Sequence, residues 1–248
     1  MTGLVSVTFR ELSPKAILAL AKQAGLEALE WGGDIHVPAG EIETARQVGE
    51  ETRAAGLAVL SYGSYYRLCA QDPPEKTFMP VLETAQALGA PNIRIWAGGK
   101  TPEEADAAYR QAAARELELV CGLAGKAGLT VSLEYHRGTL TQTAPSALAL
   151  IEAAASPNLS LYWQPNPDIS YAQNLEELRA VKGRLSHLHV FHWRNPENTR
   201  YPLAEGAQEW RGYIEEAGKD HGYLMEFVRD SKTEQFLEDA RVLQGWLN

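Results

Sequence analysis

Short runs of β-branched, leucine and aromatic residues alternate along the chain with longer segments rich in Ala, Leu, Glu, Lys and Gln. Runs of the first kind are typical of strands, and segments of the second kind are typical of helices. The pattern therefore predicts eight strands, each followed by a helix. The predicted strands are Leu4–Thr8, Ala28–Trp31, Ala58–Tyr62, Asn92–Trp96, Thr130–Glu134, Leu159–Gln164, Ser186–Phe191 and Leu224–Val228.

Several of the helical segments carry end signals. Ser13 and Pro14 predict the N-cap and the first position of a helix, and Gly25 predicts its end. The other predicted ends are Gly56 for the next helix, Thr101 and about Gly125 for a later one, and about Ser231 and Trp246 for the last.

Strands that alternate with helices pair in parallel, because a helix fills each return crossover. Eight such units in one chain predict a single (β/α)8 TIM barrel. A doubly wound open sheet is the main alternative, but it would usually bring a glycine-rich first turn, which Thr8–Glu11 does not resemble. Without a low-complexity or Pro/Ser-rich linker, residues 1–248 are expected to form one domain.

The composition narrows the classes of partner. With 248 residues and 45% hydrophobic residues, the chain can bury a core without disulfides, and its two cysteines match no metal or redox spacing. A net charge of −9 argues against a nucleic-acid partner. The chain has no run of about 18 apolar residues, and its start lacks the pattern of a signal peptide. We therefore expect a cytoplasmic protein with no membrane partner.

Charged and polar residues occupy one face of several predicted strands. Side chains alternate faces along a strand, and the lumen of an ordinary barrel is filled with branched apolar residues. Buried charges persist only when they are paired or bound to metal. The residues expected to point inward include Glu30, Arg94, Glu134, Gln164, His187, His189 and Glu226.

Four of these residues come from consecutive strands, the fifth to the eighth, near their carboxyl ends: Glu134, Gln164, His189 and Glu226. Neighbouring strands lie about 4.8 Å apart, so the four side chains could converge on one ion. Two carboxylates, an amide oxygen and an imidazole suit Mn²⁺, Mg²⁺, Co²⁺ or Zn²⁺. Each residue alone could be a buried polar residue with its hydrogen bonds made. Four such residues on the inward face of consecutive strands favour a divalent metal site.

Four segments resemble a known family. Ser132–Arg137 (SLEYHR), His187–His189 (HLH) and Leu224–Phe227 (LMEF) are similar to the metal-site motifs of xylose isomerase-like barrels, and more closely to the sugar isomerase and epimerase group that includes the ketose 3-epimerases. Glu30–Pro38 (EWGGDIHVP) resembles a motif of uncharacterised members of that group. The resemblance covers essentially the whole chain.

The resemblance implies a metal-dependent isomerase or epimerase of a small carbohydrate, a keto-sugar or a sugar phosphate. Glu134, His189 and Glu226 correspond to metal ligands, and the two glutamates to the catalytic pair that removes and returns a proton through a metal-stabilised enediolate. His136, Arg137 and His187 then contact the substrate or support the site. Barrels of this group are often oligomers, so the resemblance also implies a homo-oligomer.

One position departs from the family pattern. The family has an aspartate ligand on the sixth strand, often with a histidine three residues later, and this chain has Gln164 and Pro167 there. A neutral amide brings one negative charge fewer, so we expect weaker metal binding or a lost site. Asn166 and Asp168 are nearby alternative ligands.

Other residues after the strands are candidates for the mouth of the barrel. The expected substrate contacts there are His36, Tyr62, Trp96 and Arg194, and Tyr65 and Tyr66 could form a wall or lid. A solvated loop is the alternative for His36, and packing under a long loop is the alternative for the three tyrosines. Gly98–Lys100 is a weak phosphate signal.

Three functions follow as hypotheses. The first is the isomerase or epimerase. The second is a lyase that dehydrates a polyol or a keto-sugar acid on the same scaffold, and the third is a non-catalytic sugar-binding protein with a degraded metal site. A DNA-repair endonuclease is a distant fourth, since the chain lacks the extra ligands and the basic surface. The expected partner is a small carbohydrate.

Overall fold

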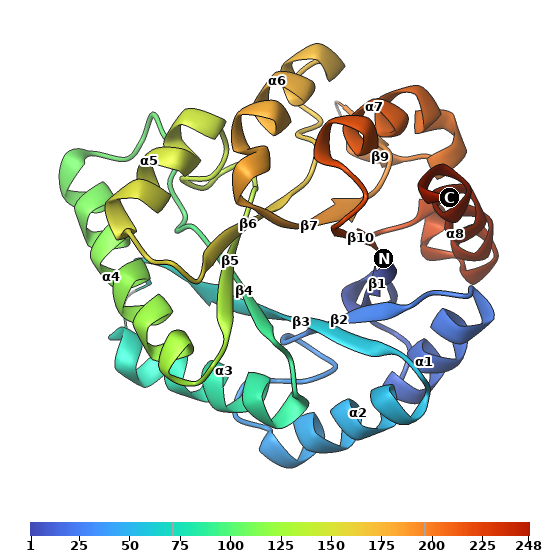
Figure 1. The fold of residues 1–248 in the computed structure, drawn as a ribbon, viewed down its shortest axis with the longest axis horizontal. Helices are drawn as coiled ribbons and strands as arrows, with labels where there is room; N and C mark the ends of the chain where they lie inside the picture. The colour runs from blue at the N-terminus through green and yellow to red at the C-terminus, as the bar shows by residue number, and fades with distance from the viewer. Residues whose placement is uncertain (71, 196) are drawn as a thin grey trace.

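The computed structural model describes residues 1–70, 72–195 and 197–248. Within these residues, eight parallel strands close into a barrel in the order β1-β10-β7-β6-β5-β4-β3-β2, which confirms the predicted (β/α)8 TIM barrel (Figure 1). The barrel strands are β1 (Thr2–Val5), β2 (Ala28–Gly32), β3 (Ala58–Arg67), β4 (Asn92–Trp96), β5 (Thr130–Glu134), β6 (Leu159–Trp163), β7 (Leu185–Val190) and β10 (Gly222–Met225).

The helices form a ring around the strands (Figure 1). They are α1 (Pro14–Gln23), α2 (Ile42–Ala54), α3 (Pro74–Leu88), α4 (Ala107–Lys126), α5 (Ala144–Ala154), α6 (Tyr171–Val181), α7 (Ala207–Ala217) and α8 (Thr233–Leu247). The core lies between the two layers, where residues such as Ile93, Ile95, Val131 and Leu133 on the outer faces of the strands are fully buried. The opposite face of each strand is thereby directed into the lumen.

β4 and β5 have the predicted bounds, and the first and last barrel strands differ from the prediction. β1 ends at Val5, and the next residues form a 3-10 turn, η1 (Ser6–Phe9). β10 ends at Met225, so Glu226 lies just beyond the strand, at the mouth of the barrel. β1 also requires glycine at position 3, since a Cβ there would lie 2.7 Å from the carbonyl oxygen of Ala28 on β2.

The predicted ends of α1 are confirmed. The Ser13 hydroxyl accepts a hydrogen bond from the Ala16 amide, Pro14 is the first helical residue, and Gly25 follows the helix with a φ of +68°. Glycine takes this left-handed conformation without the steric cost that a Cβ brings.

α4 begins later than predicted, at Ala107 rather than at Thr101. The cap is Asp106, whose carboxylate accepts a hydrogen bond from the Tyr109 amide at 2.8 Å. Thr101 and Glu104 bond to each other in a turn before the helix, with 2.9 Å between the Thr101 amide and the Glu104 carboxylate. The sequence pattern that suggested a helix start is therefore a local turn.

A short hairpin was also not predicted. Between β7 and α7, β8 (Trp193–Arg194) and β9 (Thr199–Arg200) pair as a short antiparallel hairpin. In the described part of the chain, no helix is both long enough and apolar enough to span a membrane.

Candidate metal centre and active site

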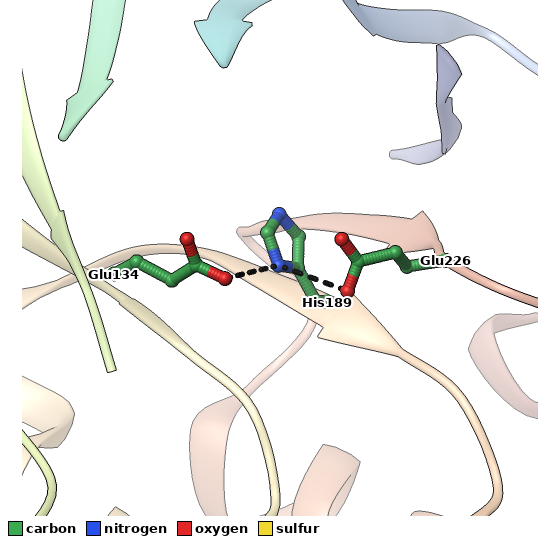
Figure 2. Close-up of side chains that lie close together, drawn as sticks. All are labelled: Glu134, His189 and Glu226. Atoms are coloured by element: carbon green, nitrogen blue, oxygen red, sulfur yellow. Dashed lines mark ion pairs between the residues drawn. The ribbon is translucent and has the colours of Figure 1, made fainter. Parts of the chain in front are cut away.

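Three buried side chains converge at the carboxyl end of the barrel (Figure 2). Glu134 is the last residue of β5, His189 lies near the end of β7, and Glu226 follows β10. His189 Nδ1 lies 3.8 Å from Glu134 Oε1 and 3.6 Å from Glu226 Oε2. The three candidate ligand atoms lie within 4.8 Å of one another, an arrangement in which they could hold one divalent ion.

Gln164 joins the same group. It follows β6 directly, and its Oε1 lies 3.2 Å from His189 Nδ1. The structure therefore brings together all four residues that the sequence proposed as ligands. The two alternatives near Gln164 have other partners: Asn166 accepts a hydrogen bond from the Asp168 amide at 3.0 Å, and Asp168 pairs with Arg137.

A buried arginine stands beside the centre. Arg94 Nε donates to Glu30 Oε1 at 2.8 Å, and Arg94 Nη1 donates to Glu134 Oε2. Burial alone would raise the pKa of Glu30, but Arg94 and His189 lower it to about 2. Glu134 thus directs one oxygen to a guanidinium and the other to His189, and these contacts fix the orientation of the carboxylate.

Glu226 is in a different electrostatic environment. In the described part of the chain its carboxylate has no ion pair besides the one with His189. Burial, together with the nearby Glu134, raises the pKa of Glu226 to about 7, although His189 and Arg94 oppose the change. In the metal-free protein Glu226 can therefore gain or lose a proton near neutral pH.

A pocket of about 240 Å³ opens above these residues. Arg94, Glu134, Gln164 and Glu226 belong to its lining, with Arg10 and Arg137 among the polar residues. The aromatic and other apolar residues of the lining are Val7, Tyr65, Trp96, Tyr135, Pro165, Pro167, Phe191, Trp193 and Phe227. A concave, largely apolar pocket with a few convergent polar groups is typical of a small-molecule site.

Three of the predicted substrate residues line this pocket: Trp96, His136 and Arg137. The rings of Trp96 and His136 are stacked, with 4.8 Å between their centroids. Arg137 Nη1 lies 3.3 Å from Asp168 Oδ2, and its Nη2 donates to Asn198 Oδ1 at 2.9 Å.

His36 and Tyr62 are absent from the pocket lining, which corrects their predicted place at the mouth. His36 is buried, and its ring nitrogens bond to the Ser6 hydroxyl at 3.0 Å and to the Leu12 carbonyl at 3.1 Å. Tyr62 is paired in register with the outward-facing Ile93, and its hydroxyl donates to the Val37 carbonyl at 2.8 Å. Both side chains stabilise the barrel wall.

His187 and Arg194 are also absent from this lining. His187 lies deeper in the barrel than His189, where its Nδ1 accepts a hydrogen bond from the Gly222 amide at 3.1 Å, and burial lowers its pKa to about 4. Arg194 is exposed on β8, with its guanidinium 5.3 Å from the ring centroid of Tyr201, and it lines a neighbouring pocket.

The sequence did not assign Phe191 and Phe227 to the site. Both follow a barrel strand, β7 or β10, and line the pocket together with Trp193, which packs against both phenylalanines at centroid distances of 4.4 and 5.7 Å. Their positions just after strand ends were the available signal, because those positions surround the mouth of a closed barrel.

The fold and the site define a parallel (β/α)8 barrel with a buried carboxylate and imidazole centre at its carboxyl end. The chain belongs to the xylose isomerase-like TIM barrel family, whose model matches residues 18–245. It is similar to a 3-dehydroshikimate dehydratase of Bacillus anthracis, with 24% identity over 212 residues, which cover 80% of this chain and 73% of that protein.

Solved structures show the same fold. The probable 3-DHS dehydratase AsbF of Bacillus anthracis matches with a TM-score of 0.85 and 22% identity, over 98% of this chain and 99% of that one. The IolI protein with a bound zinc atom matches with a TM-score of 0.80 and 15% identity, over 99% of this chain and 97% of that one. An L-ribulose 3-epimerase matches with a TM-score of 0.75 and 16% identity, over 99% of this chain and 93% of that one.

Proposed function

We propose that this chain is a divalent metal-dependent dehydratase of a small cyclic keto acid of the 3-dehydroshikimate type. The observation that carries the proposal is the asymmetry between the two glutamates of the centre. Glu134 is paired with the buried Arg94, whereas Glu226 has only His189 as an ionic partner in the described part of the chain. The similarity to a 3-dehydroshikimate dehydratase supports the choice of substrate class.

The asymmetry favours a reaction with one proton-transferring carboxylate. Epimerisation removes a proton from one face of a carbon and returns a proton to the other face, so it needs two bases. One oxygen of Glu134 is held in an ion pair with the buried Arg94 guanidinium. Glu226 has no guanidinium partner in the described part of the chain, and burial raises its pKa to about 7 in the metal-free protein, so this carboxylate is the one better placed to accept and donate the proton.

The donor set fits a divalent ion. Glu134, Gln164, His189 and Glu226 would hold it, and when bound the ion supplies the positive charge that polarises a ketone and stabilises an enolate. Glu226 would take the proton from the carbon next to the ketone. Phe191, Trp193 and Phe227 line the same pocket and form an apolar wall near this carboxylate.

The reaction is balanced without an oxidant or reductant. 3-Dehydroshikimate is a cyclic β-hydroxy ketone that carries a carboxylate. One C–H bond and one C–O bond break, a C=C bond forms, and the abstracted proton leaves with the hydroxyl as water. A further proton shift makes the ring an aromatic dihydroxybenzoate, which is readily followed by its ultraviolet absorbance.

The rim of the pocket suits an anionic substrate. Arg10 and Arg137 both line it and are partly exposed, so either guanidinium could contact a carboxylate. The ion pair of Arg137 with Asp168 orients its guanidinium at the rim.

A ketose 3-epimerase is the second candidate, because the carboxylates of Glu134 and Glu226 flank His189 from two sides, as a two-base reaction requires (Figure 2). The two functions separate in D₂O with Mn²⁺ added. The dehydratase forms an aromatic product from 3-dehydroshikimate. The epimerase incorporates deuterium into a recovered ketose such as L-ribulose without loss of water. Deuterium in the ketose, with no aromatic product from 3-dehydroshikimate, would overturn the dehydratase.

The non-catalytic sugar-binding hypothesis predicts neither result. If the purified protein neither binds nor is activated by any divalent ion, both enzymatic functions fail.

A further inference from the structure

A ring of polar contacts crosses the barrel beneath the candidate metal centre. Glu30 on β2 accepts a hydrogen bond from Arg94 on β4, and Arg94 donates to Glu134 on β5. On its other side, Glu30 Oε1 lies 3.7 Å from His189 Nε2. Glu134 and His189 face each other across the centre, so the four side chains form a closed ring that contains two of the candidate ligands.

Glu30 and His189 are the two members of this ring that do not line the pocket. The side chains of both residues are fully buried. One guanidinium faces two carboxylates here, so the pairing of Arg94 with Glu30 and Glu134 leaves one negative charge in surplus. A surplus charge in a barrel lumen is costly unless another group stabilises it.

The group that faces this surplus charge is the second nitrogen of His189. Neither His189 Nε2 nor Glu30 Oε2 has a hydrogen-bond partner among the residues described. An N–H on Nε2 would point its proton toward the carboxylate and leave Nδ1 with a lone pair, and Nδ1 is the atom that Glu134, Gln164 and Glu226 surround.

We infer that Glu30 is a positioning residue that fixes the tautomer of His189 for metal binding and, through Arg94, holds Glu134 beside the ion. Carboxylates that accept the free N–H of a ligating histidine act in this way in metal sites generally. One buried residue on β2 thereby aligns ligands from β5 and β7. The inference rests on the metal site of the proposed function, but not on the reaction carried out there.

The first test is the affinity of the metal-free protein for Mn²⁺, measured by isothermal titration calorimetry. Glu30→Gln keeps the shape of the side chain and removes its charge, and we expect it to weaken Mn²⁺ binding by about 10- to 100-fold. Glu30→Asp keeps the charge but moves it away from His189, so it should give a smaller loss. A folded Glu30→Gln variant that binds Mn²⁺ within about two-fold of the wild type would overturn the inference.

Glu116→Gln is the matched control. Glu116 is a half-buried carboxylate on α4 that accepts hydrogen bonds from the Tyr66 hydroxyl at 2.6 Å and from the Cys69 amide at 2.9 Å, away from the centre. The Glu116→Gln substitution should lower the melting temperature of the protein without changing its affinity for Mn²⁺. An equal loss of affinity in this control would mean that general destabilisation, not positioning, explains the effect in Glu30→Gln.

The second test does not depend on a variant that folds. In the wild-type protein loaded with Zn²⁺, ¹⁵N-detected imidazole NMR should show the metal on Nδ1 of His189 and the proton on Nε2, and a metal bound through Nε2 would overturn the inference. The outcomes also separate the two proposals. A wild type that fails to bind Mn²⁺ refutes both, whereas weakened binding in Glu30→Gln without any dehydratase activity refutes only the proposed reaction.

Discussion

Arg94 forms ion pairs with two buried carboxylates at once, and replacing it with methionine removes the cation while retaining much of the side-chain volume. The variant leaves Glu30 and Glu134 buried without their partner. The pKa of Glu30 is about 2 against an ordinary 4.5, a difference that corresponds to about 3 kcal/mol at about 1.4 kcal/mol per pKa unit. Loss of one partner from a buried ion pair typically costs about 3 to 5 kcal/mol. We therefore expect Arg94→Met to lower the free energy of unfolding by about 3 to 5 kcal/mol.

The assay is urea unfolding followed by circular dichroism, with a chelator present so that metal binding does not contribute. For a chain of this length the expected loss corresponds to a fall of about 10 °C in the melting temperature. Arg46→Met is the control, since Arg46 forms an exposed ion pair with Glu43 at 2.8 Å on α2 and should change stability by less than about 1 kcal/mol.

The pH dependence gives a second check on the same variant. A carboxylate with a lowered pKa in the folded state stabilises the protein above its ordinary pKa, and this stabilisation is lost as the pH falls toward the folded value. The difference between wild type and Arg94→Met should thus be largest at neutral pH and should shrink below pH 4.5, toward the folded pKa of about 2. A difference below about 1 kcal/mol at neutral pH, or one that does not change with pH, would refute the reasoning.

The remaining predictions concern the two glutamates and Gln164. Glu226→Gln and Glu134→Gln should each lower kcat by at least about 100-fold while the circular dichroism spectrum is unchanged, and a fully active variant would remove that residue from its role. Because the pKa of Glu226 is raised to about 7, its contribution to stability in the metal-free protein is present below pH 4.5 and is lost as the pH rises through about 7. Metal-free Glu226→Gln should therefore gain stability relative to the wild type over that range, and parallel pH profiles would contradict the raised pKa. Gln164→Asp should tighten Mn²⁺ binding in calorimetry, whereas an unchanged affinity would show that Gln164 is not a ligand.

The strand pattern predicted the parts of the site that depend on local geometry. Alternation along a strand determines which side chains enter the lumen, so the convergence of Glu134, Gln164 and His189 could be expected from their phase alone. Glu226 was placed inside the last strand, whereas it follows that strand and still reaches the centre.

Features that depend on contacts between distant residues could not be predicted in this way. The ring of His36 bonds to Ser6 and Leu12, residues that no periodicity connects to it. The hairpin that carries Trp193 into the pocket lies in the connection between β7 and α7. Hydrophobic residues in this connection follow neither the helix period nor the strand period, so the pattern does not predict the hairpin. The pairing of Arg94 with Glu30 joins residues 64 positions apart on strands that are not neighbours.

The central claim is tested most directly by the purified wild-type protein with 3-dehydroshikimate, first stripped of metal and then supplied with Mn²⁺, Mg²⁺, Co²⁺ or Zn²⁺ in turn. Our account predicts that an aromatic product forms only when a divalent ion is present, and that Glu226→Gln forms none under the same conditions. The account would be contradicted if no product formed with any of the four ions. It would also be contradicted if product formed equally well without metal, or equally well in Glu226→Gln.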